Sequence, residues 1–171
     1  MLEAAIFVIF PLCMAIAAFS DMLTMTIPNR VSVILAGSFL LLVPFMGFEM
    51  TEILWHLSAG VSVFAVCFLL FALNVMGGGD VKVLSAGALW YGFNQSLFVF
   101  LGLVGILGGL LALIVLVIRA NQNTLLVSPV PIPMHFFKSS SGIPYGIAIG
   151  IAAFLTYPDT EIVQIAIANL R

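Results

Sequence analysis

The stretch SLFVFLGLVGILGGLLALIVLVI, residues 96–118, contains no charged side chain and is long enough to cross a bilayer, which takes about 20 apolar residues. The whole chain of 171 residues shares this character: 63% of its residues are hydrophobic, only 7% are charged, and the mean hydropathy is +1.29. Such a chain cannot cover itself with polar side chains as a soluble protein does. The sequence therefore predicts an all-α, polytopic membrane helix bundle.

Further apolar stretches bring the expected number of transmembrane helices to about six, of which the fourth and sixth are short. No basic residue precedes the first stretch and no A-x-A cleavage site follows it, so we expect it to be retained rather than removed as a signal peptide. We expect one membrane domain over residues 1–171, with spans at Leu2–Phe19, Val31–Phe48, Ile53–Met76, Val81–Phe93, Ser96–Ile118 and from Ile143 onward.

One long connection, residues 119–142, separates the last two spans. Prolines at positions 129, 131 and 133 forbid a continuous helix there, so a cytoplasmic loop is predicted. Connections of this length in compact proteins tend to be functional or disordered. After the last span, residues 162–170 are apolar enough to form a short interfacial helix or to extend that span.

The few charged residues fall on different sides of the membrane by sign when successive loops are assigned to alternate sides, with the amino terminus outside. Lys and Arg are retained on the cytoplasmic side of short loops. Two crossings separate Asp21 from Asp80, so both are predicted at the cytoplasmic face, whereas Trp55 and His56 are expected in the outer interfacial belt. The inside loops hold Arg30, Lys82, Arg119 and Lys138, and the outside loops and ends hold Glu3, Glu49, Glu52, Asp159 and Glu161, with only Arg171 against the pattern.

Asp21 and Asp80 suggest a paired-carboxylate site. An ionised carboxylate costs about 2.5–3.5 kcal/mol at the centre of a span and less toward the interface, so burial favours its protonated form. Two such groups held close together share one proton. In aspartic proteases the ionised member takes a proton from water, while the protonated member donates to the peptide carbonyl oxygen. Gly77, Gly78 and Gly79 are expected to supply positive φ angles and a close approach for a substrate strand.

Other interpretations remain open on the residues alone. Either aspartate by itself is better explained as a helix end, Asp21 closing the first helix and Asp80 capping the fourth. An ion or proton-coupled transporter would also use an intramembrane carboxylate pair, although such sites normally lie near the bilayer midplane in broken helices. A noncatalytic assembly subunit of the membrane is a third alternative.

Three motifs carry a resemblance to a known family. Asp21, Thr24, Ile27, Pro28 and Asn29 form D-x-x-T-x-x-I-P-N, and Gly77, Gly79, Asp80 and Lys82 form G-x-G-D-x-K. Pro144, Tyr145, Gly146 and Ala148 form P-Y-G-x-A at the start of the last span. In order and layout this chain resembles the prepilin peptidases, the GxGD-type intramembrane aspartic proteases of type IV pilus systems.

The resemblance implies that Asp21 and Asp80 are the catalytic pair of a GxGD aspartic protease fold in the bacterial cytoplasmic (inner) membrane. The substrate it implies is a prepilin with a short basic leader, cut at the cytoplasmic face, with the pilus-assembly machinery or a second copy of the chain as further partners. Longer members of the family carry a zinc-binding CxxC insertion and methylate the new amino terminus. The short spacing between Asp21 and the second span leaves no room for such an insertion, so the chain resembles the peptidase-only form of Flp-type, tight-adherence pilus systems.

The sequence gives no reason to expect a cofactor, a metal site or a nucleic-acid partner. Cys13 and Cys67 both lie inside apolar stretches without a CxxC pair, and no Cys, His and Glu ligand cluster is present. The net charge of −2 without a basic cluster argues against nucleic acid. For Lys82 three roles stay open: binding a phosphate headgroup, obeying the positive-inside rule, or lowering the pKa of Asp80.

Overall fold

A computed structural model describes residues 2–120 and 142–170, and within these ranges the protein consists of helices without a strand. The all-α expectation is therefore confirmed. Lys138, His135 and most of the predicted 119–142 loop lie outside the described residues. The elements are α1 (Leu2–Thr24), α2 (Asn29–Leu42), the 3-10 turn η1 (Val43–Phe45), α3 (Met50–Ala72), α4 (Gly78–Tyr91), α5 (Gln95–Ala120), α7 (Tyr145–Thr156), the 3-10 turn η3 (Tyr157–Asp159) and α8 (Glu161–Ala168).

Three of these helices, α1, α3 and α5, are long and apolar enough to cross a membrane. The segment from Tyr145 to Ala168 adds a fourth candidate if its two parts, bent by 45° at Thr160, count as one span. The helices α1, α2, α3, α4, α5 and α7 follow the six predicted spans in order, but α2 and α4 have only 14 residues each. The protein is thus a membrane protein, while the count of six spans stays a prediction.

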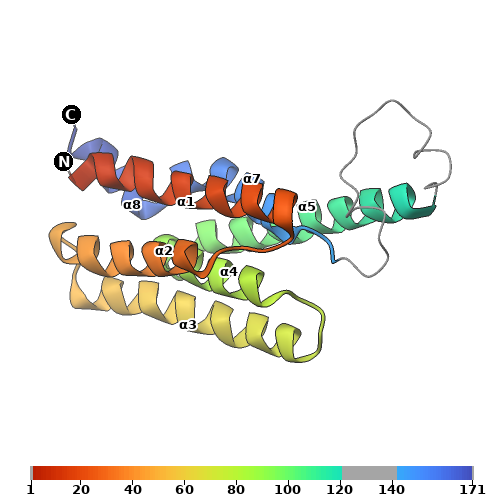
Figure 1. Ribbon diagram of the computed structural model, residues 1–171. Helices are drawn as coiled ribbons and strands as arrows, with labels where there is room; N and C mark the ends of the chain where they lie inside the picture. Colours follow the sequence, from red (N-terminus) through yellow and green to blue (C-terminus); the bar gives the residue numbers. More distant parts are fainter. Residues whose placement is uncertain (1, 121–141, 171) are drawn as a thin grey trace.

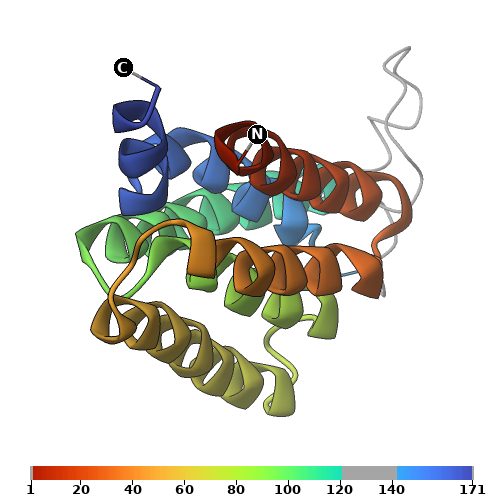
Figure 2. The same cartoon turned by 90° about the vertical axis from the view of Figure 1, so that its left-hand side faces the viewer.

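Helix α4 lies at the centre of the bundle. It packs against α3 on one side and α2 on the other, while α7 packs against both α1 and α5 (Figures 1 and 2). The indole N–H of Trp90 in α4 donates to the carbonyl oxygen of Leu35 in α2 at 2.9 Å. The ring of Phe10 in α1 lies with its centroid 5.7 Å from that of Trp90 and stacks on Tyr157 with centroids 4.0 Å apart. Large aromatic side chains therefore join α4 to both α1 and α2.

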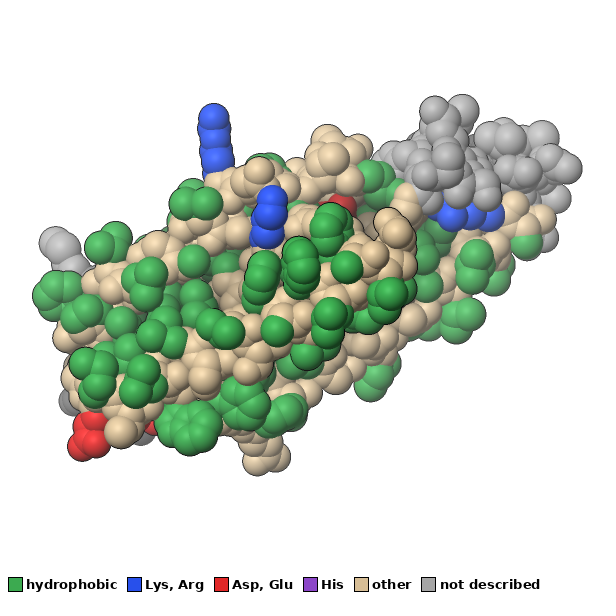
Figure 3. Space-filling model, turned by 90° about the horizontal axis from the view of Figure 1, so that it is seen from below, with side chains coloured by type: hydrophobic (Ala, Val, Ile, Leu, Met, Phe, Trp, Pro, Cys, Tyr) green, Lys and Arg blue, Asp and Glu red, His purple; other side chains and the backbone are tan. Residues whose placement is uncertain are grey.

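Charge divides the bundle into two ends. Helices α1, α3 and α5 finish at the end where α2, α4 and α7 begin, and we call this the basic end because it holds Arg30, Lys82 and Arg119. The opposite, acidic end brings Glu52 and Glu161 to one small cavity. In the space-filling view, acidic side chains project at the lower left, and Lys and Arg lie along the upper edge and toward the right (Figure 3). Which end faces the cytoplasm stays a prediction.

The belt interpretation is wrong for His56. Trp55 is 60% exposed, as a belt residue would be, but His56 is only 2% exposed. Its Nδ1 lies 2.7 Å from the carbonyl oxygen of Leu89, and its ring packs between Phe39 and Phe48. The chain turns after α4 at Gly92, whose φ of +72° and closeness to the His56 ring both require a glycine. His56 thus fastens α3 to the end of α4.

Close contact between α1 and α7 depends on Gly150. A Cβ atom at this position would lie 2.8 Å from Ala18 Cβ and 3.2 Å from the Met14 carbonyl oxygen, so no side chain fits. Small residues at this contact let the two helix backbones approach closely, as they do in other membrane helix pairs. The packing matters for the site because α1 carries Asp21 and α7 carries Gly146.

We expect Gly150→Val to destabilise the protein by about 1–3 kcal/mol, because overpacking forces α1 and α7 apart. The measurement is the thermal unfolding temperature of the purified protein in detergent. Gly102→Ala in α5 is the matched control, since a Cβ there meets no atom within 4 Å. Equal melting temperatures for Gly150→Val and wild type would contradict the described α1 and α7 packing.

Candidate functional site

Asp21 lies further inside its helix than the sequence indicated. The first apolar stretch was expected to end near Phe19, but α1 continues to Thr24 and places Asp21 in its last turns, with 6% of the residue exposed. Its Oδ2 accepts a hydrogen bond of 2.7 Å from the backbone N–H of Gly146, in the first turn of α7. The carboxylate therefore caps a neighbouring helix, and the partial positive charge of that helix end stabilises its negative charge.

Gly146 is glycine for a steric reason. A Cβ atom there would lie 2.7 Å from Asp21 Cβ and 2.9 Å from Asp21 Oδ2, closer than real atoms approach. Pro144 occupies the N-cap position of α7, and Tyr145 packs its ring against Gly108 of α5. The P-Y-G motif thus begins a helix whose first turn holds Asp21.

Asp80 lies in the first turn of α4, three residues after the N-cap residue Gly77, and is 7% exposed. It is therefore not itself the N-cap of this helix. The side chain folds back so that its Oδ2 would be 3.0 Å from a Cβ atom at position 77. This is the place from which a side chain reaches back toward the start of its own helix.

The three glycines differ in part from the prediction. The expectation of positive φ angles is wrong, because the positive-φ glycines of the described residues are Gly47 and Gly92, and Gly77 is extended at φ −71°. The approach of a substrate strand stays a prediction, and the close neighbours described belong to this chain. Added Cβ atoms at Gly78 and Gly79 would lie 3.3 Å from the Phe71 ring and 3.2 Å from Ile27 Cβ. The glycines let neighbouring helices and the α1–α2 connection reach the start of α4.

Asp21 and Asp80 line one cavity of about 490 Å³ at the basic end. The sequence argument from loop parity is therefore correct in placing both carboxylates at one end of the bundle. The other described residues of the cavity wall are Met25, Phe71, Asn74, Val75, Met76, Gly77, Arg119, Gly142, Ile143 and Tyr145.

The remaining motif residues build the surroundings of this cavity and do not line it. The Thr24 hydroxyl donates to the Ser20 carbonyl oxygen at 2.8 Å and closes the end of α1. Pro28 is the N-cap residue of α2, and Asn29 Oδ1 accepts a hydrogen bond of 2.9 Å from Lys82 Nζ. The first two motifs therefore meet directly, because Ile27 packs on Gly79 and Asn29 bonds Lys82.

Several residues of the cavity wall were missed from the sequence. Arg119, at the end of α5, donates from Nη2 to the Gly142 carbonyl oxygen at 3.0 Å and so ties α5 to the segment that leads into α7. Met25 and Asn74 follow α1 and α3 with φ angles of +55° and +58°, which are uncommon for residues other than glycine. Arg119 carried a usable signal as a lone cation at the end of a span, whereas nothing in the sequence marks Met25.

Across residues 2–120 and 142–170 no group of three or more His, Cys, Asp or Glu side chains could hold a metal ion. Cys13 and Cys67 are separate buried thiols on α1 and α3. The polar side chains of the described cavity wall are the carboxylates of Asp21 and Asp80, the Arg119 guanidinium, the Asn74 amide and the Tyr145 phenol.

Comparison with known families decides the classification. The profile of the type IV leader peptidase family matches residues 8–113, which is more than half of the chain and includes both aspartates. The chain belongs to this family. Searches of the curated proteins and of the solved structures gave no match. The resemblance to prepilin peptidases is thereby confirmed at the level of the family, and a leader peptidase embedded in a membrane acts on prepilin-type substrates in general.

Gly146→Ala tests whether this leader peptidase needs the α7 contact. We expect cleavage of a pilin precursor to fall about tenfold to hundredfold, because the Cβ displaces Asp21 and breaks a hydrogen bond to a charged group worth about 1.5–3 kcal/mol. Cleavage is followed by gel shift of the precursor with enzyme in detergent. Gly37→Ala serves as the control, since a Cβ there meets nothing within 4 Å. Unchanged cleavage by Gly146→Ala would show that the contact is dispensable.

Proposed function

We propose that the protein is an intramembrane aspartic endopeptidase that removes the leader peptide from prepilins at the cytoplasmic membrane face, with Asp21 and Asp80 as its catalytic pair. The observation that carries the proposal is that two buried carboxylates, far apart in sequence, line a single cavity at the basic end. A cavity with two such groups suits the activation of water against a peptide bond.

The surroundings of the two carboxylates suggest their roles. Asp21, which accepts the Gly146 N–H at the start of α7, is the better placed to carry the negative charge and to take a proton from the attacking water. Asp80, which lines the same cavity and has no such helix-end donor from a neighbouring helix among the hydrogen bonds described, holds the shared proton and donates it to the carbonyl oxygen as the tetrahedral intermediate forms. Collapse of that intermediate breaks the C–N bond: the protonated carboxyl that forms on Asp21 gives its proton to the leaving amine, while Asp80 takes a proton back from a hydroxyl of the intermediate as the carbonyl reforms, so the pair again holds one proton.

The position of the site favours a peptidase over a transporter. Asp21 lies in the last turns of α1 and Asp80 in the first turn of α4, both at helix ends. A site that binds a transported ion normally lies near the bilayer midplane in broken helices. A leader peptide entering from the membrane surface needs carboxylates at the depth of these helix ends.

The connection after α1 supports the short, peptidase-only form of Flp-type pilus systems. Helix α1 ends at Thr24 and α2 begins at Asn29, so the zinc-binding insertion of longer prepilin peptidases has no place between them. We therefore infer no methyltransferase activity. The accompanying expectation is that a mature pilin made by this protein carries an unmethylated amino terminus, which mass spectrometry of the product reads directly.

Replacing either catalytic carboxylate should abolish the reaction. We expect Asp21→Asn and Asp80→Asn each to lower precursor cleavage by at least about 10³-fold, because an amide can neither accept the proton from water nor share it with its partner. Asp159 is an exposed carboxylate at the acidic end, and the Asp159→Asn variant should cleave normally. Each variant must still insert and keep the wild-type melting profile. Substantial cleavage by a correctly folded variant would remove that residue from the mechanism, and an inactive wild type would favour the noncatalytic subunit.

Orientation can be tested separately in whole cells with a membrane-impermeant maleimide, in a background without Cys13 and Cys67. We expect Thr51→Cys at the acidic end to be labelled from outside and Thr26→Cys at the basic end to be labelled only after the membrane is opened. Both side chains are exposed. The reverse labelling pattern would place the aspartate cavity on the outer face.

A further inference from the structure

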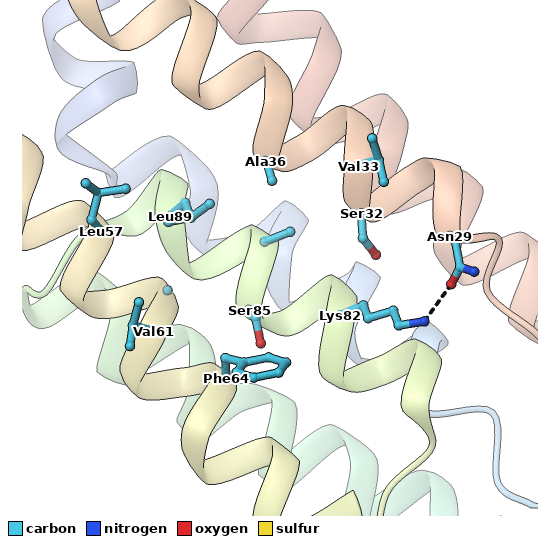
Figure 4. Close-up of a pocket in the computed structure, with 12 residues that line it drawn as sticks. Asn29, Ser32, Val33, Ala36, Leu57, Val61, Phe64, Lys82, Ser85 and Leu89 are labelled. Atoms are coloured by element: carbon cyan, nitrogen blue, oxygen red, sulfur yellow. Dashed lines mark hydrogen bonds between the residues drawn. The ribbon is translucent and has the colours of Figure 1, made fainter.

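A second cavity, separate from the aspartates, opens on the side of the bundle. A groove of about 590 Å³ runs between α2 and α3, with α4 as its floor (Figure 4). None of its lining residues is among those of the aspartate cavity. Most of its wall is apolar, with Ala36 from α2, Val61 and Phe64 from α3, and Leu89 from α4. The groove is therefore a place for hydrocarbon.

Polar groups occur in the groove in a definite order along the helices. At the basic end, Lys82 Nζ and Asn29 Oδ1 are joined by their hydrogen bond of 2.9 Å (Figure 4). About one helical turn deeper come two hydroxyls, Ser32 on α2 and Ser85 on α4, each three residues beyond a member of that pair. Beyond the hydroxyls the described lining is apolar as far as Leu89.

The Ser32 hydroxyl has no partner. Its Oγ is a buried polar atom without a hydrogen bond in a residue that is only 9% exposed, whereas the Ser85 hydroxyl donates to the Val81 carbonyl oxygen. A buried hydroxyl left unpaired costs about 1–3 kcal/mol. Ser32 is one of the residues that line the groove, so a ligand bound there would bring an acceptor to the depth of this hydroxyl.

Along the groove a positive charge is followed by hydroxyls and then by an apolar wall. A glycerophospholipid has groups that match these in the same order: a phosphate, an ester carbonyl and an acyl chain. We propose that this groove binds an anionic phospholipid, with its phosphate on Lys82, an ester carbonyl on Ser32 and one acyl chain along α4. Basic pockets between transmembrane helices hold lipid headgroups in other membrane proteins. A transmembrane peptide or a second copy of the chain would fill the hydrocarbon part but has no need of a cation at the rim, and so the single lysine favours the lipid.

Lipid retention by the purified protein tests the site without reference to catalysis. The probes are phosphatidylglycerol and phosphatidylcholine with the same acyl chains, titrated into detergent-solubilised protein and counted by native mass spectrometry. We expect one phosphatidylglycerol to bind at least about tenfold more tightly than phosphatidylcholine, and Lys82→Gln to remove this preference, because a hydrogen bond to a charged group contributes about 1.5–3 kcal/mol. Arg30→Gln is the matched control: it removes an equal charge from the same basic end of the bundle, at a residue outside the groove, and should leave the lipid preference unchanged.

A second pair of variants separates the lipid site from a general effect of charge. Ser32→Ala should leave the melting temperature of the lipid-free protein unchanged or raised, because the hydroxyl has no partner to lose, and should reduce the rise in melting temperature that phosphatidylglycerol produces. Ala36→Phe should fill the groove and abolish lipid retention while the protein still unfolds cooperatively. Equal binding of the two lipids, or an effect of Arg30→Gln as large as that of Lys82→Gln, would overturn the proposal. Crosslinking of a pilin precursor into the groove without competition from phosphatidylglycerol would overturn it as well.

Discussion

The hydrogen bond from the Gly146 N–H to the Asp21 carboxylate is the contact on which the cavity at the basic end depends. A carboxylate that is 6% exposed needs a donor, and the free N–H groups in the first turn of a helix supply one without adding a charged side chain. The contact requires the backbone of α7 to touch the side chain of Asp21. That requirement explains the glycine at position 146 and the close approach of α1 and α7 at Gly150, about one turn further along α7.

The same principle of backbone approach joins the other motifs. Ile27 packs against Gly79, the Phe71 ring packs against Gly78, and the Lys82 ammonium donates a hydrogen bond to Asn29. The start of α4 is therefore held by α3 on one side and by the α1–α2 connection and α2 on the other. Motifs that look like separate signatures in the sequence are thus the two sides of one set of contacts. Lys82 belongs to this set as a rim residue of the lateral groove rather than as a wall of the aspartate cavity.

Much of the architecture could be predicted from the sequence, because apolar stretches and the side of the membrane on which charged loops fall can both be read along the chain. The order of helices and the meeting of Asp21 and Asp80 at one end follow from them. Three features could not be predicted in this way, because each depends on which neighbour packs there: the end of α1 at Thr24, the burial of His56 and the extended φ of Gly77. For the same reason the hydrogen bond to Asp21 could be found only in three dimensions: the P-Y-G motif marked Gly146, but nothing in the sequence indicated that its backbone N–H, 125 residues away, donates to this carboxylate.

Arg119 gives the aspartate cavity a further property. It is the one cation among the described residues that line the cavity, beside two carboxylates. With a single proton shared by the pair, as the proposed mechanism requires, the pair carries −1 and the guanidinium +1, so the ionisable groups of the described wall sum to zero. A neutral set of charges is much cheaper to enclose in a low-dielectric membrane protein than an uncompensated one. The cavity can therefore hold its reactive proton at the edge of the bilayer without drawing a counterion from solution.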